Sequence, residues 1–237
     1  MRQHSREEIL RAVRNKDSVA DVFRRLEKHY GDVFSNMADS LLNPVMDSVV
    51  KETQTNIQNS IPAEAGIVIG ELTPAAQGVI DQVFNVNREA MRSLPQKYLG
   101  SVKSTVIDFV SGRGTETTLR DLTSKIKQIN ESTDEEAHRA SMDLVRSAYQ
   151  GVAIERARSV GSTRGIWVHT YGHGKYPREN HEHADGHEFD LTTGEFLTGP
   201  FKGTGCGYGS KDNKMVLPGQ PRYCHCTFRL KIDFGVE

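Results

Sequence analysis

The spacing of apolar residues changes at about residue 161, and this change constrains the fold more than any other feature of the chain. Before it, apolar side chains recur every three or four residues, which is the period of an α-helix. After it, short runs of alternating apolar and polar residues are separated by glycine-rich turns, which is typical of β-strands. We therefore expect an α+β protein with a helical body over residues 1–160 and a small, loop-rich β or α+β domain over residues 161–237.

The first helical stretch covers residues 5–57. Ser5 and Glu8 fit a capping box, in which two side chains bond to each other's backbone at the start of a helix. The apolar stripe that follows predicts one long amphipathic helix or a close pair of helices, and the proline- and glycine-containing segment 60–66 ends it. We interpret the stripe as core or helix–helix packing.

The next helices are predicted by local signals. Thr73 and Pro74 predict a helix that runs to about Ser93, because threonine caps helix starts and proline suits the first helical position. Residues 99–110 predict another helix, and the Gly-Arg-Gly segment 112–114 ends it.

The last part of the helical body contains a second capping signal. Residues 119–129 carry leucine and isoleucine at helical spacing. The polar residues 130–132 interrupt this stripe, and Thr133 with Glu136 then fit another capping box. We expect a long helix to begin there and to end near Gly161.

Short strands are expected in the C-terminal domain, over residues 166–170, 188–191, 195–197 and 224–232. The last run alternates, so a period of two places Cys224 and Cys226 on one face of a strand and His225 on the other. A domain of roughly 75 residues with few apolar side chains usually needs a metal, a disulfide or a partner surface to hold it together.

The cysteines and most of the histidines lie after residue 168, so the side chains that bind metals are concentrated in this small domain. Three thiolates and one imidazole suit a tetrahedral zinc site that is structural and closed to substrate. Buried cysteines without a ligand, and a redox pair, remain alternatives for the same thiols. The candidate ligands are Cys206, Cys224, Cys226 and His181, with His183 or His187 as alternatives to His181.

A second pattern, R-x-x-H-x-x-x-D-G, holds Arg178, His181, Asp185 and Gly186. Histidines beside a carboxylate can bind a metal that activates water, which predicts a metal-dependent nuclease or a toxin-like domain. The alternative that we favour is structural. In it, His181 and Asp185 tie a loop to a strand by hydrogen bonds, and the neighbouring histidines are solvated.

The bulk composition argues against several classes of protein. The formal net charge of -1 argues against a protein that coats nucleic acid, because that requires many clustered lysines and arginines, although local contact with DNA stays open. No apolar run has the length of a membrane span, so we expect no membrane association and a protein made in a cytoplasm. Three cysteines do not make the disulfide framework of a secreted domain.

Taken in order, the motifs resemble those of a known family, the minor head proteins of tailed bacteriophages. This group includes the phage Mu minor head protein and the head morphogenesis proteins of Bacillus phages. Its pattern has a helical region, a strand with a tryptophan, the R-x-x-H-x-x-x-D-G loop and a proline-rich approach to a Cys-Arg-Cys near the end. The positions that match are Trp167, Arg178, His181, Asp185, Gly186, Pro218, Cys224 and Cys226.

Two positions depart from the pattern of the family. His225 stands where the family has the arginine between the cysteines, and Arg146-Ser147-Ala148 stands where an Arg-Thr-Glu is often found. The resemblance in motifs covers about residues 140–230, and the N-terminal helices match only in kind.

The resemblance implies a structural protein of the virion and not an enzyme. Members are minor capsid proteins that associate with the portal or the inside of the head and act in head assembly or in DNA packaging and delivery. It therefore implies the portal protein and other capsid proteins as partners, with the helices as a docking or self-association surface. A further interpretation, a host-encoded interaction module stabilised by zinc, needs no capsid partner.

Overall fold

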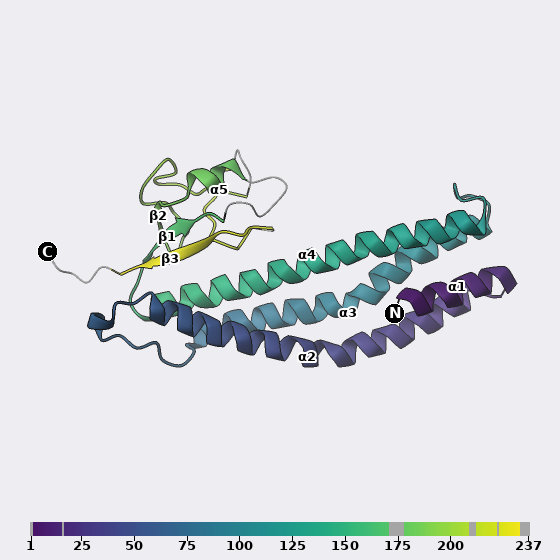
Figure 1. Ribbon diagram of the computed structural model, residues 1–237, viewed down its shortest axis with the longest axis horizontal. Helices are drawn as coiled ribbons and strands as arrows, with labels where there is room; N and C mark the ends of the chain where they lie inside the picture. The colour runs from purple at the N-terminus through teal and green to yellow at the C-terminus, as the bar shows by residue number, and fades with distance from the viewer. Residues whose placement is uncertain (1, 16, 171–177, 209–211, 222, 233–237) are drawn as a thin grey trace. The chain divides into compact units, whose positions relative to one another are not determined.

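The computed structural model describes residues 2–15, 17–170, 178–208, 212–221 and 223–232. Long helices come first and a small sheet comes last, which confirms the predicted α+β fold (Figure 1). No helix in these residues combines the length and the apolarity needed to cross a bilayer. The helices are α1 (Arg2–Asn15), α2 (Val19–Asn59), η1 (Ala63–Ala65, a 3-10 turn), α3 (Pro74–Val110), α4 (Leu119–Ser159) and α5 (Glu179–His183), and the strands are β1 (Arg164–Val168), β2 (Glu188–Asp190) and β3 (Thr227–Lys231).

The contacts within the chain divide it into two compact units. The first comprises Met1–Asn43 and Asn85–Ser141, and the second comprises Pro44–Phe84 and Met142–Glu237. The predicted division at residue 160 lies between α4 and β1, whereas the contact boundaries cut the three long helices. The second unit therefore contains the small sheet together with parts of α2, α3 and α4.

The first unit has a helical core of its own. Apolar residues from each of its helices are buried there, as the periodicity of the sequence predicts. Those with no exposed side-chain surface are Phe23, Leu99, Val102, Val106, Leu122 and Ile126.

Several helix ends follow the local signals. Helix α3 begins at Pro74, and the Thr73 hydroxyl accepts a hydrogen bond of 3.2 Å from the Ala76 N–H. Helix α2 ends at Asn59, where the predicted break begins. After α4 ends at Ser159, Gly161 adopts a left-handed backbone (φ 84°), which glycine does at low cost.

Three predicted boundaries are wrong. Helix α1 begins at Arg2, so the buried Ser5 lies inside the helix and does not cap it. Helix α3 is continuous through residues 93–99 and contains Pro95. Helix α4 is also continuous, and the Thr133 hydroxyl donates to the Ile129 carbonyl (2.7 Å). A threonine that bonds to the preceding turn satisfies its hydroxyl without ending the helix.

The true start of α4 is a capping box that the sequence analysis missed. The Thr118 hydroxyl accepts a hydrogen bond from the Asp121 N–H (3.2 Å), and the Asp121 carboxylate accepts one from the Thr118 N–H (3.0 Å). The Thr118 hydroxyl also donates to the Asp121 carboxylate (2.8 Å). This bond, together with that from the Thr118 N–H, holds the pKa of the Asp121 carboxyl below its usual value. The signal was present in the sequence, with aspartate in the place of the usual glutamate.

The sheet has the order β2-β1-β3, and both pairings are antiparallel. Trp167 lies opposite Phe228 in the ladder between β1 and β3. The strand predicted at 195–197 is wrong, because Phe196 forms only isolated bridges with Phe189 and Lys202. The strand predicted at 224–232 is shorter than expected, because the ladder covers Thr227–Lys231 and leaves both cysteines before it.

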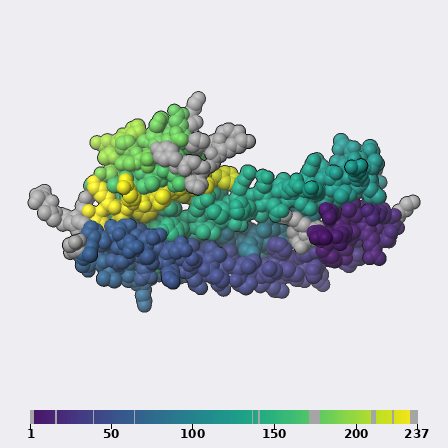
Figure 2. Space-filling model, viewed as in Figure 1, coloured from purple at the N-terminus to yellow at the C-terminus, as the bar shows by residue number. Residues whose placement is uncertain are grey.

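The core of the second unit is built around Trp167, which has no exposed surface. Its indole ring meets the rings of Phe189 and Phe196, each with a centroid separation of 5.6 Å. Buried residues of the helices complete this core, so the few apolar side chains of the sheet are supplemented by helix ends. The helical contributors are Ile57, Ala153, Ile154 and Ala157. On the face drawn in Figure 2, the side chains of β3 (yellow) adjoin those of the segments around α5 (green).

Two helical glycines in the second unit test how closely α3 and α4 pack there. A Cβ atom at Gly151 of α4 would lie 2.7 Å from Val79 Cγ1 of α3, whereas one at Gly78 would meet no atom within 4 Å. We expect Gly78→Ala to raise the free energy of unfolding by about 1 kcal/mol, because alanine favours helices over glycine. Gly151→Ala should lower it by up to about 2 kcal/mol, because overpacking outweighs that gain.

Chemical denaturation of the two variants beside the parent chain measures both changes. Equal stabilisation by the two substitutions would contradict the close packing of α4 on Val79.

Candidate metal centre

The R-x-x-H-x-x-x-D-G motif forms a single helical turn that is hydrogen-bonded to strand β1. Arg178 has an extended backbone and precedes α5, and Gly186 follows the turn with a left-handed φ of 77°. The Gly186 N–H donates to the Trp167 carbonyl, and the Trp167 N–H donates to the His187 carbonyl, both at 2.9 Å. The loop therefore continues the hydrogen-bond ladder of β1.

Asp185 adds a side-chain bond to the same strand. Its Oδ1 accepts a hydrogen bond of 2.9 Å from the His169 N–H, just after β1 ends. This contact is the loop-to-strand hydrogen bond expected from the structural interpretation of the motif.

His181 lies at the centre of the site and is 2% exposed. Its Nε2 lies 3.0 Å from the Gly207 carbonyl oxygen. Because a carbonyl only accepts hydrogen bonds, Nε2 carries a proton. Nδ1 is then the atom that faces the cysteines, at 3.5 Å from Cys224 Sγ and 3.4 Å from Cys226 Sγ.

Together, His181, Cys224 and Cys226 form a buried group that can hold a metal ion. Among the described residues, these three have ligand atoms that all lie within 4.8 Å of one another. Two ligands on one tetrahedral zinc, with a nitrogen and a sulfur at ordinary bond lengths, are about 3.6 Å apart. The two N···S distances agree with that separation, so the group needs little rearrangement to close around an ion.

The pKa values of the two thiols, Cys224 and Cys226, are shifted in opposite directions. The hydrogen bond from Cys226 lowers the pKa of Cys224, with His181 acting in the same direction. Donating that hydrogen bond raises the pKa of Cys226, and burial adds to the effect. The pair therefore favours one thiolate even without a metal, and a thiolate is the form that binds metals.

The Trp167 indole also favours a metal-bound thiolate, in this case at Cys226. Its ring packs edge-on against His181, with a centroid separation of 5.3 Å. Among the described residues, its buried Nε1 has no hydrogen-bond partner, although it lies close enough to Cys226 to favour the ionised form of that thiol. A buried N–H without an acceptor is costly, and a metal-bound thiolate at Cys226 would accept from it.

The structure does not bring every predicted ligand into the group. Cys206 is buried in the same core cluster, but its sulfur is not among the atoms within 4.8 Å of one another. Burial raises the pKa of the Cys206 thiol to about 12. His183 is exposed on α5, and His187 is half-buried with its ring against Gly199. Neither belongs to the group.

The segment that leads to the cysteines is attached to helix α4. The buried Gly219, next to Pro218, packs so closely on Gln150 that a Cβ would lie 2.6 Å from its Cγ. Tyr223 has a left-handed backbone (φ 60°), and its N–H donates to Asp143 Oδ1 (3.0 Å). These contacts fix the chain just before Cys224.

The His225 side chain contacts helix α4, although His225 lies before β3 and not in the regular strand from which its direction was predicted. Arg146 Nη1 of α4 lies 3.0 Å from His225 Nε2, and because a guanidinium only donates, this nitrogen is the acceptor. The position that departs from the Cys-Arg-Cys pattern is therefore bonded to a helix and does not face the candidate metal.

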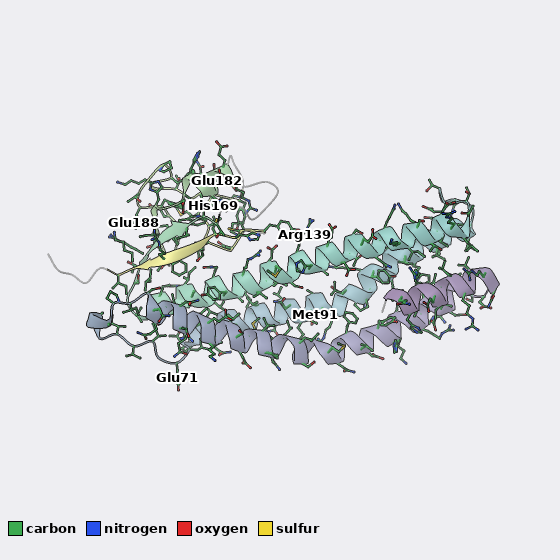
Figure 3. All side chains as sticks on the ribbon, viewed as in Figure 1. Glu71, Met91, Arg139, His169, Glu182 and Glu188 are labelled. Carbon is green, nitrogen blue, oxygen red and sulfur yellow. The ribbon has the colours of Figure 1, made fainter. Side chains whose placement is uncertain are left out.

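The sequence analysis missed one residue at the site, His169. Its Nδ1 lies 3.5 Å from Cys226 Sγ, and its Nε2 lies 4.0 Å from Glu182 Oε1. Figure 3 shows His169 and Glu182 beside each other. The available signal was the period of two, which places His169 on the same side of the chain as the buried Trp167.

Comparisons of the chain with models of protein families, with curated proteins and with solved structures found no match.

The Asp185 bond to β1 can be tested with two substitutions. Asp185→Ala leaves the His169 N–H without its acceptor, so we expect the free energy of unfolding to fall by about 1–3 kcal/mol. Asp185→Asn keeps an oxygen at the same position, so it should avoid most of that loss. Thermal or urea unfolding of the two variants gives the comparison, and equal losses would show that the negative charge, not the hydrogen bond, is what matters.

Proposed function

We propose that this chain is a minor head protein of a tailed bacteriophage, a structural component near the portal or inside the head that acts in head assembly or in DNA packaging and delivery. The proposal rests on the resemblance in the order of the tryptophan strand, the R-x-x-H-x-x-x-D-G loop and the Cys-x-Cys. The helices would supply the surface that binds the portal protein, other capsid proteins or further copies of the chain.

The observation that carries the proposal is the convergence of these motifs. Trp167, His181 and the two cysteines come from three separate segments and meet in one buried cluster. Side chains that are needed together to build one centre account for a motif set that is spread over about sixty residues. Their common role is to hold a small domain in a fixed shape.

We propose further that the ion held by this cluster is zinc and that its role is structural. Thiolates with an imidazole select zinc among the common divalent ions of cells. His181, Cys224 and Cys226 are each no more than 3% exposed, so substrate would not reach an ion held there, which favours a structural zinc. A zinc-stabilised interaction module with a partner other than the capsid is the second candidate, and the same buried group favours it.

Removal of the metal gives the first test. A strong chelator should unfold the C-terminal domain, because the energy of metal binding and the energy of folding are then the same quantity. Trp167 is the single tryptophan of the chain and lies against His181, so its fluorescence reports on this domain alone. We expect a red shift on chelation that excess zinc reverses, and metal analysis should find about one zinc per chain.

The control for this experiment is the helical signal in circular dichroism. Most of it should remain, because the helices of the first unit have a core of their own that contains no candidate ligand. Unchanged tryptophan fluorescence and an unchanged melting temperature in chelator would contradict the zinc proposal. That result would not bear on the head-assembly role.

Binding to the portal gives the second test. Met37 and Leu41 lie four residues apart on α2 and are 46% and 50% exposed, so they form an apolar pair on the helical surface. We expect the tagged full chain to retain the portal protein of the same genome, and Leu41→Glu to lower this retention at least about tenfold, as for a residue central to an interface.

Lys28→Glu is the matched control, because it introduces the same side chain at an exposed position of the same helix. Failure of the parent chain to retain the portal protein would contradict the head-assembly proposal. Divalent-metal-dependent cleavage of DNA or RNA that is lost in His181→Ala would support the nuclease interpretation in its place.

A further inference from the structure

We propose that His169 is the fourth ligand of the metal centre, which makes it a closed site of two cysteines and two histidines, with Glu182 as the residue that positions the His169 ring. This inference rests on the metal proposed above and is independent of the head-assembly role.

The distance between His169 and Cys226 is that of two ligands on one ion. His169 Nδ1 lies 3.5 Å from Cys226 Sγ. The separation expected of a nitrogen and a sulfur on tetrahedral zinc is about 3.6 Å. This is the same relation that His181 has with both cysteines. The nitrogen is outside the group of atoms within 4.8 Å of one another, so coordination requires the His169 ring to turn toward Cys224 and His181.

The backbone of His169 is held in place for this role. Its N–H donates to Asp185 Oδ1, on the loop that also carries His181. The side chain is 10% exposed, so its ring already lies mostly out of water. A ligand whose backbone is fixed before the metal arrives loses only side-chain conformational entropy on binding it.

Glu182 gives the ring its orientation. Its Oε1 lies 4.0 Å from His169 Nε2, on the side of the ring away from Cys226. Histidine ligands generally donate their second N–H to a carboxylate or a carbonyl, which fixes the tautomer that leaves the other nitrogen free for the metal. His181 already has such a bond, 3.0 Å long, to the Gly207 carbonyl. At 4.0 Å, Glu182 would form the corresponding bond as the His169 ring turns. Both histidines would thus bind through Nδ1.

The charge of the site favours His169 over Cys206. Two thiolates and two neutral imidazoles balance the charge of Zn²⁺, whereas three thiolates leave a net negative charge in a buried place. His181, Cys224 and Cys226 are each no more than 3% exposed, so water cannot screen that charge. Cys206 is then an ordinary buried cysteine that packs in the core.

Cobalt(II) in place of zinc distinguishes the two sites, because its thiolate charge-transfer absorption grows with the number of bound sulfurs. The metal-free full chain is titrated with Co²⁺ and compared with standards that hold two and three thiolates. We expect tetrahedral d–d bands and the charge-transfer intensity of two thiolates. His169→Cys should keep the tetrahedral bands and raise this intensity by about half, since a third sulfur then binds.

Two further variants separate the ligands from their neighbours. Cys206→Ser should leave the cobalt spectrum unchanged. Glu182→Gln should keep the spectrum but weaken the affinity for Zn²⁺ by about 10–100-fold, as is usual when the partner of a histidine ligand is removed. His183→Gln is the matched control, because His183 is exposed on the same helical turn, and its spectrum and affinity should both equal those of the parent chain.

A three-thiolate spectrum in the parent chain that falls to two in Cys206→Ser would overturn the inference and make Cys206 the ligand. An unchanged spectrum in His169→Cys would also overturn it. Absence of any cobalt or zinc binding would overturn the metal centre as a whole. None of these results depends on the portal-binding experiment, so a failure here is distinct from a failure of the head-assembly proposal.

Discussion

The hydrogen bond between His181 Nε2 and the Gly207 carbonyl is the contact on which the C-terminal domain depends. It fixes the protonation and the rotation of a buried ring, so that Nδ1 faces Cys224 and Cys226. It also joins α5 to the glycine-rich segment around Gly207, which the sheet does not reach. The edge-on contact with Trp167 then ties the same ring to β1. The His181 ring therefore connects α5, β1 and the segment around Gly207, which have little apolar surface of their own.

The C-terminal domain also depends on the burial of apolar side chains that come from outside its sheet. The sheet has few apolar side chains, and a small domain of this kind gains little from the hydrophobic effect alone. The end of α4 therefore contributes Ala153, Ile154 and Ala157 to its core. The cysteine segment is attached to the same helix through Gln150 and Arg146. This sharing explains why the contact units do not divide at residue 160, where the periodicity of the sequence changes.

The features that the sequence predicted well are local ones. Thr73 and Pro74 determine a helix start by their own chemistry, and α3 begins there. Thr133 shows the limit of such signals, because a capping motif inside a continuous apolar stripe does not end the helix. The residue types of the candidate metal ligands could also be predicted. Their selection could not, because the approach of His169 to Cys226 depends on the Asp185 bond and on the ladder between β1 and β3.

The same geometry favours a structural role of the site over a catalytic one. A nuclease site needs a metal with an open coordination position and a histidine or carboxylate that reaches substrate. Both ring nitrogens of His181 face groups of the protein. Asp185 Oδ1 accepts a hydrogen bond from the His169 N–H, just after β1. An ion bound by this buried set would be surrounded by protein ligands, so its binding energy would stabilise the fold. A domain stabilised in this way presents a fixed surface, which suits the structural role proposed above better than a catalytic one.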